Sequence, residues 1–225
     1  MTGTSRKPPL LRARWPEHSE EFLTHPGRAV GSATALLALV LLLALLVPAG
    51  PLTLDSRWSE LMQDIETPFL THLALIFNAL GRGVWRALTL AAIAMVLLAG
   101  RRWSALIAFA LAEALTPLLG NLIKALVDRP RPPGQMLEAH GSSFPSGHAA
   151  YAGVTAVALV LLCSRPGRQR PLWFTVAAVV IAEMAWSRTY LQVHWLSDVL
   201  GGATLGLAVA FFSFGVVQIS LTRHR

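Results

Sequence analysis

Apolar stretches separated by short polar segments make up most of this sequence, a pattern typical of helices that cross a membrane. We interpret six of these stretches as spans, at 30–47, 84–99, 103–123, 146–162, 172–186 and 196–219. A further stretch at 69–80 is too short to cross. The pattern therefore predicts an all-α fold, a polytopic membrane protein built as a six-transmembrane-helix bundle.

One segment after the first span is amphipathic rather than uniformly apolar. Over 55–66, polar residues alternate with Trp58, Leu61, Met62 and Ile65 at helical spacing. A helix of this kind lies in the plane of the interface with its apolar face towards the lipid. We expect an outer interfacial helix here, with Trp58 at the depth of the headgroups.

The polar ends of the chain set the predicted domain boundaries. Residues 1–28 are polar and interrupted by prolines, and we interpret them as a cytoplasmic N-terminal tail. The six-span domain then covers 29–221, and 222–225 form a cytoplasmic C-terminus. The alternative to a first span is a cleaved signal peptide. The long polar segment before the apolar stretch and the prolines at 48 and 51 favour an uncleaved anchor.

Composition supports the membrane class and argues against nucleic acid as a partner. Hydrophobic residues make up 54% of the chain and charged residues 14%, whereas soluble domains average about 25% charged residues. The net charge is +7, but the basic residues lie between apolar stretches instead of forming a face studded with aromatic residues. The one cysteine, Cys163, excludes an intramolecular disulfide and is interpreted as a packing residue.

The distribution of lysine and arginine predicts the orientation. Twelve lie in the two ends and in the turns near 101 and 168, and seven lie on the opposite side. By the positive-inside rule, both termini of this multi-pass plasma-membrane protein are cytoplasmic. The polar motifs over 124–198 then all lie at the outer ends of their spans.

The last of these motifs has a histidine and a carboxylate at helical spacing. In Ser187-Arg188-x5-His194-x3-Asp198, His194 and Asp198 share one helical face if the last span begins near Val193. The carboxylate then orients one ring nitrogen and leaves the other free to act as a nucleophile. Arg188 offers a planar fork to phosphate oxygens. A His–Asp pair that only caps a helix fits this segment equally well.

Two earlier motifs have residue types suited to binding an anion. Pro145-Ser146-Gly147-His148 begins a span, where free backbone N–H groups bind anions, and His148 lies where a general acid is needed. Lys124-x6-Arg131-Pro132 has two cations in a loop stiffened by proline. Alone, these motifs also fit an ordinary helix start and a basic turn that reaches the headgroups.

Together, the three motifs resemble the signature motifs of the type 2 phosphatidic acid phosphatase superfamily in order, spacing and residue type. The resemblance covers about 55–220. It implies a metal-independent phosphatase that works through a phosphohistidine and needs no cofactor. By resemblance, the catalytic residues are His194 as nucleophile, Asp198 as its orienting carboxylate, and His148 as acid and then base. The phosphate-binding residues it implies are Lys124, Arg131, Ser146, Gly147 and Arg188.

Several polar residues near the motifs allow other interpretations. A zinc site built from His140, His148, His194 and Asp198 has suitable ligands, but the adjacent cations repel a metal ion. Glu183 lies one turn before Ser187, and we expect it to support Arg188. The sequence does not place Glu113, a second carboxylate within a span.

The predicted function is hydrolysis of a lipid phosphate or diphosphate at the outer membrane face. The resemblance implies undecaprenyl pyrophosphate, phosphatidylglycerol phosphate or phosphatidic acid as the substrate. A lipid phosphotransferase with the same site, or a phospholipid transporter that only binds headgroups, are the alternatives. Gly202-x3-Gly206 is typical of helix packing within a bundle and, less often, of a dimer face.

Overall fold

The computed structural model describes residues 23–47, 50–164 and 170–223. In these ranges the chain forms helices and no strand, which confirms the all-α fold class. The helices are α1 (Pro26–Leu46), α2 (Thr53–Asp64), α3 (Pro68–Leu80), α4 (Gly83–Ala99), α5 (Trp103–Val127), α6 (Gly147–Cys163), α7 (Arg170–Tyr190) and α8 (Leu196–Arg223).

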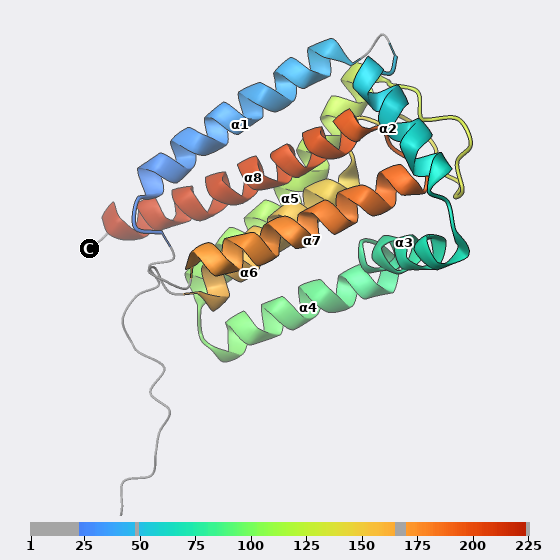
Figure 1. Ribbon diagram of the computed structural model, residues 1–225. Coiled ribbons are helices and arrows are strands. Elements are labelled where there is room, and N and C mark those ends of the chain that lie inside the picture. The colour runs from blue at the N-terminus through green and yellow to red at the C-terminus, as the bar shows by residue number, and fades with distance from the viewer. Residues whose placement is uncertain (1–22, 48–49, 165–169, 224–225) are drawn as a thin grey trace, which may run out of the picture.

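The long helices run side by side as a bundle in which α8 is central (Figure 1). Helix α8 packs against α1, α5, α6 and α7. Three helices have the length and hydropathy of a membrane span, namely α1, α5 and α8. A fourth candidate is the pair α3 and α4, which is bent by 53°. The multi-pass membrane character is therefore confirmed, and the count of six spans stays a prediction.

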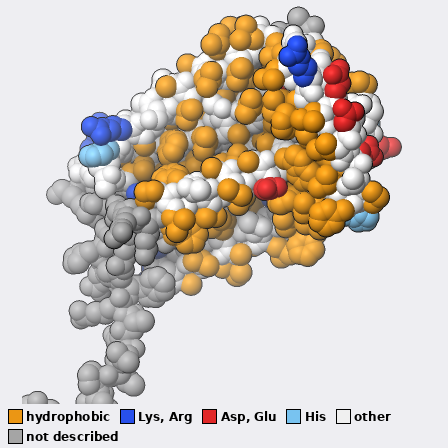
Figure 2. All heavy atoms as spheres, in the orientation of Figure 1, with side chains coloured by type: hydrophobic (Ala, Val, Ile, Leu, Met, Phe, Trp, Pro, Cys, Tyr) orange, Lys and Arg blue, Asp and Glu red, His pale blue; other side chains and the backbone are white. Residues whose placement is uncertain are grey.

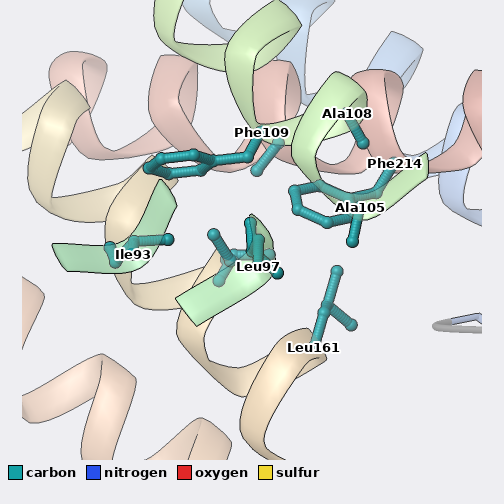
Figure 3. Packing of buried hydrophobic residues seen from close by; sticks show 10 residues of the cluster. Ile93, Leu97, Ala105, Ala108, Phe109, Leu161 and Phe214 are labelled. Carbon is teal, nitrogen blue, oxygen red and sulfur yellow. The ribbon is translucent and has the colours of Figure 1, made fainter. Parts of the chain in front are cut away.

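Hydrophobic side chains cover most of the surface seen in Figure 2, as expected for a bundle that faces lipid. Exposed acidic side chains in this view gather at the end where α2 lies, and acidic atoms are also visible near the middle of the face. Inside, a cluster that includes Ile93, Leu97, Phe109, Leu161 and Phe214 joins α4, α5, α6 and α8 (Figure 3). This cluster lies towards the ends of the helices that are far from the motifs, so it fixes the bundle without occupying the site.

Small residues bring α6 and α8 into close contact. A Cβ added at Gly202 would lie 2.2 Å from the carbonyl oxygen of Ser146, and one added at Gly206 would lie 2.1 Å from that of Ala150. The Gly202-x3-Gly206 pattern therefore packs within the bundle, the more common of its two expected uses. This contact sets the first turn of α6 against the first turns of α8.

Helix α2 confirms the amphipathic helix expected at 55–66, but its inner face contacts protein. Asp55, Ser59 and Met62 are buried, and the indole Nε1 of Trp58 donates a hydrogen bond of 2.9 Å to Thr189 Oγ1. The indole N–H of Trp58 is therefore directed to α7 and not to lipid headgroups. The position of α2 at a membrane interface stays a prediction.

Several predicted boundaries shift in the structure. Helix α1 begins at Pro26, inside the segment expected to be a tail, and residues 1–22 lie outside the described part of the chain. Helix α5 extends to Val127 and α7 to Tyr190, so Lys124 and Arg188 both lie within helices. Each of these cations is therefore held on a regular backbone.

Candidate active site

The three motifs meet at one end of the bundle. They lie at the end of α5, the start of α6, the end of α7 and the start of α8, with the 128–146 loop between α5 and α6 (Figure 1). Helix α2 covers this end from the side and contacts α7 and α8. Segments more than sixty residues apart in sequence are thus brought together, as shown by the bond from Arg131 to Val193.

His194 and Asp198 are neighbours, but they do not lie together on a helix. Helix α8 begins at Leu196, where the span at 196–219 was predicted to begin, so His194 lies in the short connection before the helix and the condition for a shared helical face is not met. Asp198 Oδ2 lies 3.5 Å from His194 Nδ1 and accepts a 2.8 Å hydrogen bond from the Trp195 N–H. Catalytic hydrogen bonds are often this long before the substrate is bound. The same oxygen, Oδ2, therefore caps the start of α8 and faces His194.

Burial sets the protonation state of His194. Its side chain is only 5% exposed. Desolvation lowers the pKa of His194 to about 4, although the Asp198 carboxylate acts in the opposite direction. The imidazole is therefore neutral near pH 7. A neutral ring with Nδ1 directed to Asp198 leaves Nε2 as the nucleophilic atom.

The second motif begins α6 next to His194. Ser146 is the N-cap residue of α6, and its backbone N–H donates a 3.0 Å hydrogen bond to the carbonyl oxygen of Asp198. A Cβ built on Gly147 meets nothing within 4 Å, so space is open there. The ring of His148 packs closely against the α3–α4 turn, where a Cβ on Gly81 would lie 2.3 Å from His148 Cδ2.

The three predicted cations are held at this end of the bundle. Arg131 donates to four carbonyl oxygens, the shortest bond being 2.6 Å to Val193. Lys124 Nζ donates a 2.8 Å bond to the carbonyl oxygen of Ser142, and Arg188 donates to Asn78 Oδ1. Burial lowers the pKa of Arg131, an effect that the Asp198 carboxylate opposes. These bonds fix the positions of the cations before any ligand binds.

Within the described part of the chain, three motif residues keep buried polar atoms that make no hydrogen bond, namely Ser146 Oγ, His148 Nε2 and Arg188 Nε. His194 Nδ1 makes no hydrogen bond of normal length either, but it faces Asp198 Oδ2 at 3.5 Å. Buried polar atoms are nearly always hydrogen-bonded, so a group of such atoms in one place needs an explanation. An oxyanion between α6, α7 and the 191–195 connection would accept hydrogen bonds from the donors among them.

Arg129 is a site residue that the sequence analysis missed, because it was counted only as one of the outer basic residues. Its side chain is fully buried and lies between Asp55 and Asp198. The one local signal is its place in an Arg-Pro-Arg-Pro run. Its carboxylate partners lie far away in sequence, so no local pattern indicates the pairing.

The structure also places the other polar residues that were considered. Glu113 pairs with Arg86 at 2.8 Å, and the Arg86 guanidinium lies 3.3 Å from the ring centroid of Tyr151. Among the described residues, no ion pair links Glu183 to Arg188, so the supporting role of Glu183 stays a prediction.

The described part of the chain holds no group of three or more His, Cys, Asp and Glu side chains placed to share a metal ion. His140, a ligand in the alternative zinc site, accepts a hydrogen bond from Arg131 through its backbone carbonyl. The polar groups around His148 and His194 are thus mainly cations and hydrogen-bond donors.

A cavity of 370 Å³ leads from His148 between α4, α6 and α7. Its walls are almost entirely apolar, and side chains along it include Leu90, Tyr151, Leu159, Trp173 and Val180. Cavities of roughly 300–1,000 Å³ hold small ligands. An apolar cavity that reaches the polar residue His148 suits a molecule with one polar end and a hydrocarbon body.

Known proteins share sequence with this chain. Residues 103–221 match the family model described as PAP2 superfamily. A phosphatidylglycerophosphatase B from Bacillus subtilis (strain 168) is 35% identical over 103 residues, or 44% of this chain, and the match spans only 51% of that relative. An undecaprenyl-diphosphatase from Sulfolobus acidocaldarius is 30% identical over 162 residues, or 68% of this chain and 72% of that protein.

Solved structures share the fold. The crystal structure of a transmembrane PAP2 type phosphatidylglycerolphosphate phosphatase from Bacillus subtilis aligns with a TM-score of 0.67 at 24% identity, over 86% of this chain and 98% of the other. Aquifex aeolicus LpxE aligns with a TM-score of 0.57 at 24% identity, over 75% of this chain and 96% of the other. At 24% identity, the two alignments support the fold alone.

Proposed function

Because this chain belongs to the PAP2 superfamily, we propose that it hydrolyses a lipid phosphate or diphosphate with His194 as the nucleophile. The observation that carries the proposal is the neutral His194 beside Asp198, placed next to buried polar atoms of Ser146, His148 and Arg188 that have no protein partner. Phosphoryl transfer needs mainly positioning and stabilisation of charge on the phosphoryl oxygens.

In the first step, His194 Nε2 forms a bond to phosphorus while the bond from phosphorus to the leaving oxygen breaks. His148 gives its proton to that oxygen, so the lipid alcohol or lipid monophosphate departs neutral at the cleaved position. The proton on His194 Nδ1 faces Asp198, which stabilises the positive charge that develops on the ring. Lys124, Arg131 and Arg188 hold the phosphoryl oxygens.

In the second step, water attacks the phosphorus of the phosphohistidine. His148, now neutral, takes a proton from that water, the bond from phosphorus to His194 breaks, and inorganic phosphate leaves. The enzyme returns to its first state because the proton that His148 lost in the first step is regained in the second. An alcohol in place of water would make the same site a phosphotransferase.

The apolar cavity beside His148 supports a lipid as the substrate. Undecaprenyl pyrophosphate, phosphatidylglycerol phosphate and phosphatidic acid each combine a phosphate with a long hydrocarbon chain. The distribution of basic residues supports an active site on the outer face of the plasma membrane, with both termini in the cytoplasm.

The proposal is tested by measuring release of inorganic phosphate by the purified protein from these three lipids and from a water-soluble phosphate ester. We expect release from at least one lipid without an acceptor alcohol, and loss of nearly all of it in His194→Ala and most of it in His148→Ala. Retained turnover in His194→Ala contradicts the nucleophile, and release only with an alcohol present supports a transferase. Loss of activity in chelator that zinc restores would replace this mechanism with a metal-dependent one.

A further inference from the structure

We propose that Arg129 is a positioning residue for the nucleophile, and that Asp55 of α2 sets how far Arg129 offsets the negative charge of Asp198. The inference rests on the proposed function, since it concerns the group that orients His194. It adds to the motif residues a buried link from the amphipathic helix α2 to the catalytic pair.

The link consists of one guanidinium between two carboxylates. Arg129 Nη2 lies 2.7 Å from Asp55 Oδ2, and Arg129 Nη1 lies 2.5 Å from Asp198 Oδ1. The three side chains are at most 1% exposed. Arg129 Nη2 also donates to the carbonyl oxygen of Gly50 at 3.0 Å. Buried charges are stable only when they are paired and hydrogen-bonded, and here one cation serves two anions.

Asp55 is held rigidly in its place. Its two oxygens accept hydrogen bonds from the backbone N–H groups of Leu52 and Ser197, and from the Ser197 hydroxyl, at 2.8–2.9 Å. Arg129 is a further donor to the same carboxylate. Ser197 is the residue before Asp198, so α2 and the first turn of α8 are joined at the catalytic aspartate.

The two oxygens of Asp198 have different partners. Oδ1 accepts from Arg129, while Oδ2 accepts from the Trp195 N–H and faces His194 Nδ1. Arg129 therefore fixes the rotation of the carboxylate that determines where Oδ2 points. A clamp that only held α2 to α8 would need the Asp55–Ser197 bonds alone and would not need a cation on Oδ1.

In the same geometry, the negative charge of Asp198 interacts with both the Arg129 cation and the His194 nucleophile. The charged or titratable groups that face His194 are Asp198, Arg131, Arg188 and His148. Of these only Asp198 favours the imidazolium form. Pairing of Asp198 with Arg129 weakens the stabilisation of the His194 imidazolium by Asp198. Pairing of Arg129 with Asp55 partly restores that stabilisation. Removing Asp55 and removing Arg129 should therefore change the protonation of His194 in opposite directions.

The test is the pH profile of kcat/KM for Asp55→Asn and Arg129→Met, measured as phosphate release by purified protein. We expect the acid limb to move to lower pH in Asp55→Asn and to higher pH in Arg129→Met, each by about one pH unit. The substrate titrates identically in both, so the difference between them reports on the enzyme. In Arg129→Met we also expect kcat to fall about 100-fold with KM little changed, because a misplaced catalytic group costs this much.

Two further variants separate positioning from folding. Arg170→Met removes an arginine that binds Ser164 far from the site, and it should leave the profile unchanged. If Arg129→Met does not fold, the acid limb of Asp55→Asn alone tests the proposal. The double variant Asp55→Asn/Arg129→Met then takes the place of Arg129→Met, because it replaces both members of the buried ion pair by neutral side chains. A stable Asp55→Asn whose acid limb does not move overturns the proposal. Wild-type protein that releases no phosphate, or that does not need His194, instead overturns the proposed function.

Discussion

At the scale of single residues, the reactivity of His194 depends on two opposing influences. Burial lowers the pKa of His194 to about 4 and keeps the ring neutral. In the proposed mechanism, Asp198 stabilises the positive charge that develops on the ring when His194 attacks phosphorus. A nucleophile needs the first condition before the reaction and the second during it. Burial of the ring provides the first condition and Asp198 provides the second, while Arg129 offsets part of the charge of Asp198.

The contact between His148 and Gly81 gives a prediction at this scale. Gly81→Ala adds a methyl group 2.3 Å from His148 Cδ2, so the ring must turn away from its place. We expect kcat to fall roughly 10- to 100-fold, since displacing a catalytic group by about 1 Å has effects of this size. The measurement is steady-state phosphate release. Gly31→Ala, whose added carbon meets nothing within 4 Å, is the control and should keep full activity.

Sequence patterns anticipated the motif residues more fully than the contacts among them. The spacing of His194 and Asp198 indicated that they meet, although the reason given, a shared helical face, was wrong. Arg129 escaped notice because its partner Asp55 lies 74 residues earlier and belongs to another helix. Asn78 lies in the apolar segment at 69–80 and Gly81 directly follows it, and nothing in their own spacing marks them as neighbours of Arg188 and His148.

At the scale of helices, the active site depends on how closely α6 approaches α8. The backbone of α6 lies directly on Gly202 and Gly206, so the N-terminus of α6, with its free N–H groups, comes against the first turns of α8. Hydropathy located both helices within a few residues. The angle and depth of their contact depend on residues with no side chain, whose role becomes clear only when both helices are placed.

This contact predicts a large effect of a small substitution. Gly206→Ala places a carbon 2.1 Å from the Ala150 carbonyl oxygen, and a helix backbone cannot move aside as a side chain can. Overpacking of this kind costs about 1–3 kcal/mol. We expect a lower melting temperature in detergent together with lower activity. Gly120→Ala, whose added carbon would make an ordinary 3.9 Å contact with Leu205, should show neither change.

At the scale of the whole molecule, the bundle joins a polar end to an apolar cavity. The cations and histidines lie where four helices end, and the cavity runs from His148 along α4, α6 and α7. A lipid with a phosphate headgroup fits this arrangement, because its phosphate needs a polar site and its hydrocarbon chain needs an apolar one. The apolar stretches of the sequence indicated the membrane, whereas the cavity follows from gaps between side chains of three helices and has no signal in any one of them.

Filling the cavity should separate binding of the hydrocarbon from the chemistry. Thr155→Trp places a bulky ring on the wall of the cavity. We expect KM for a long-chain lipid phosphate to rise about tenfold or more, while turnover of a short, water-soluble phosphate ester stays near the wild-type value, since the ring lies away from the phosphate. Leu118→Trp, on a side chain 64% exposed on α5, is the matched control. An equal loss for both substrates would contradict a tail-binding role for this cavity.

The central claim is that His194 itself receives the phosphoryl group. The most direct measurement mixes excess purified protein with a lipid phosphate radiolabelled in its phosphate, stops the reaction in alkali within one turnover, and maps the labelled residue by mass spectrometry. The account predicts label on His194 that forms before inorganic phosphate appears and decays as it is released. Absence of label during active turnover, or label that persists in His194→Ala, would contradict it.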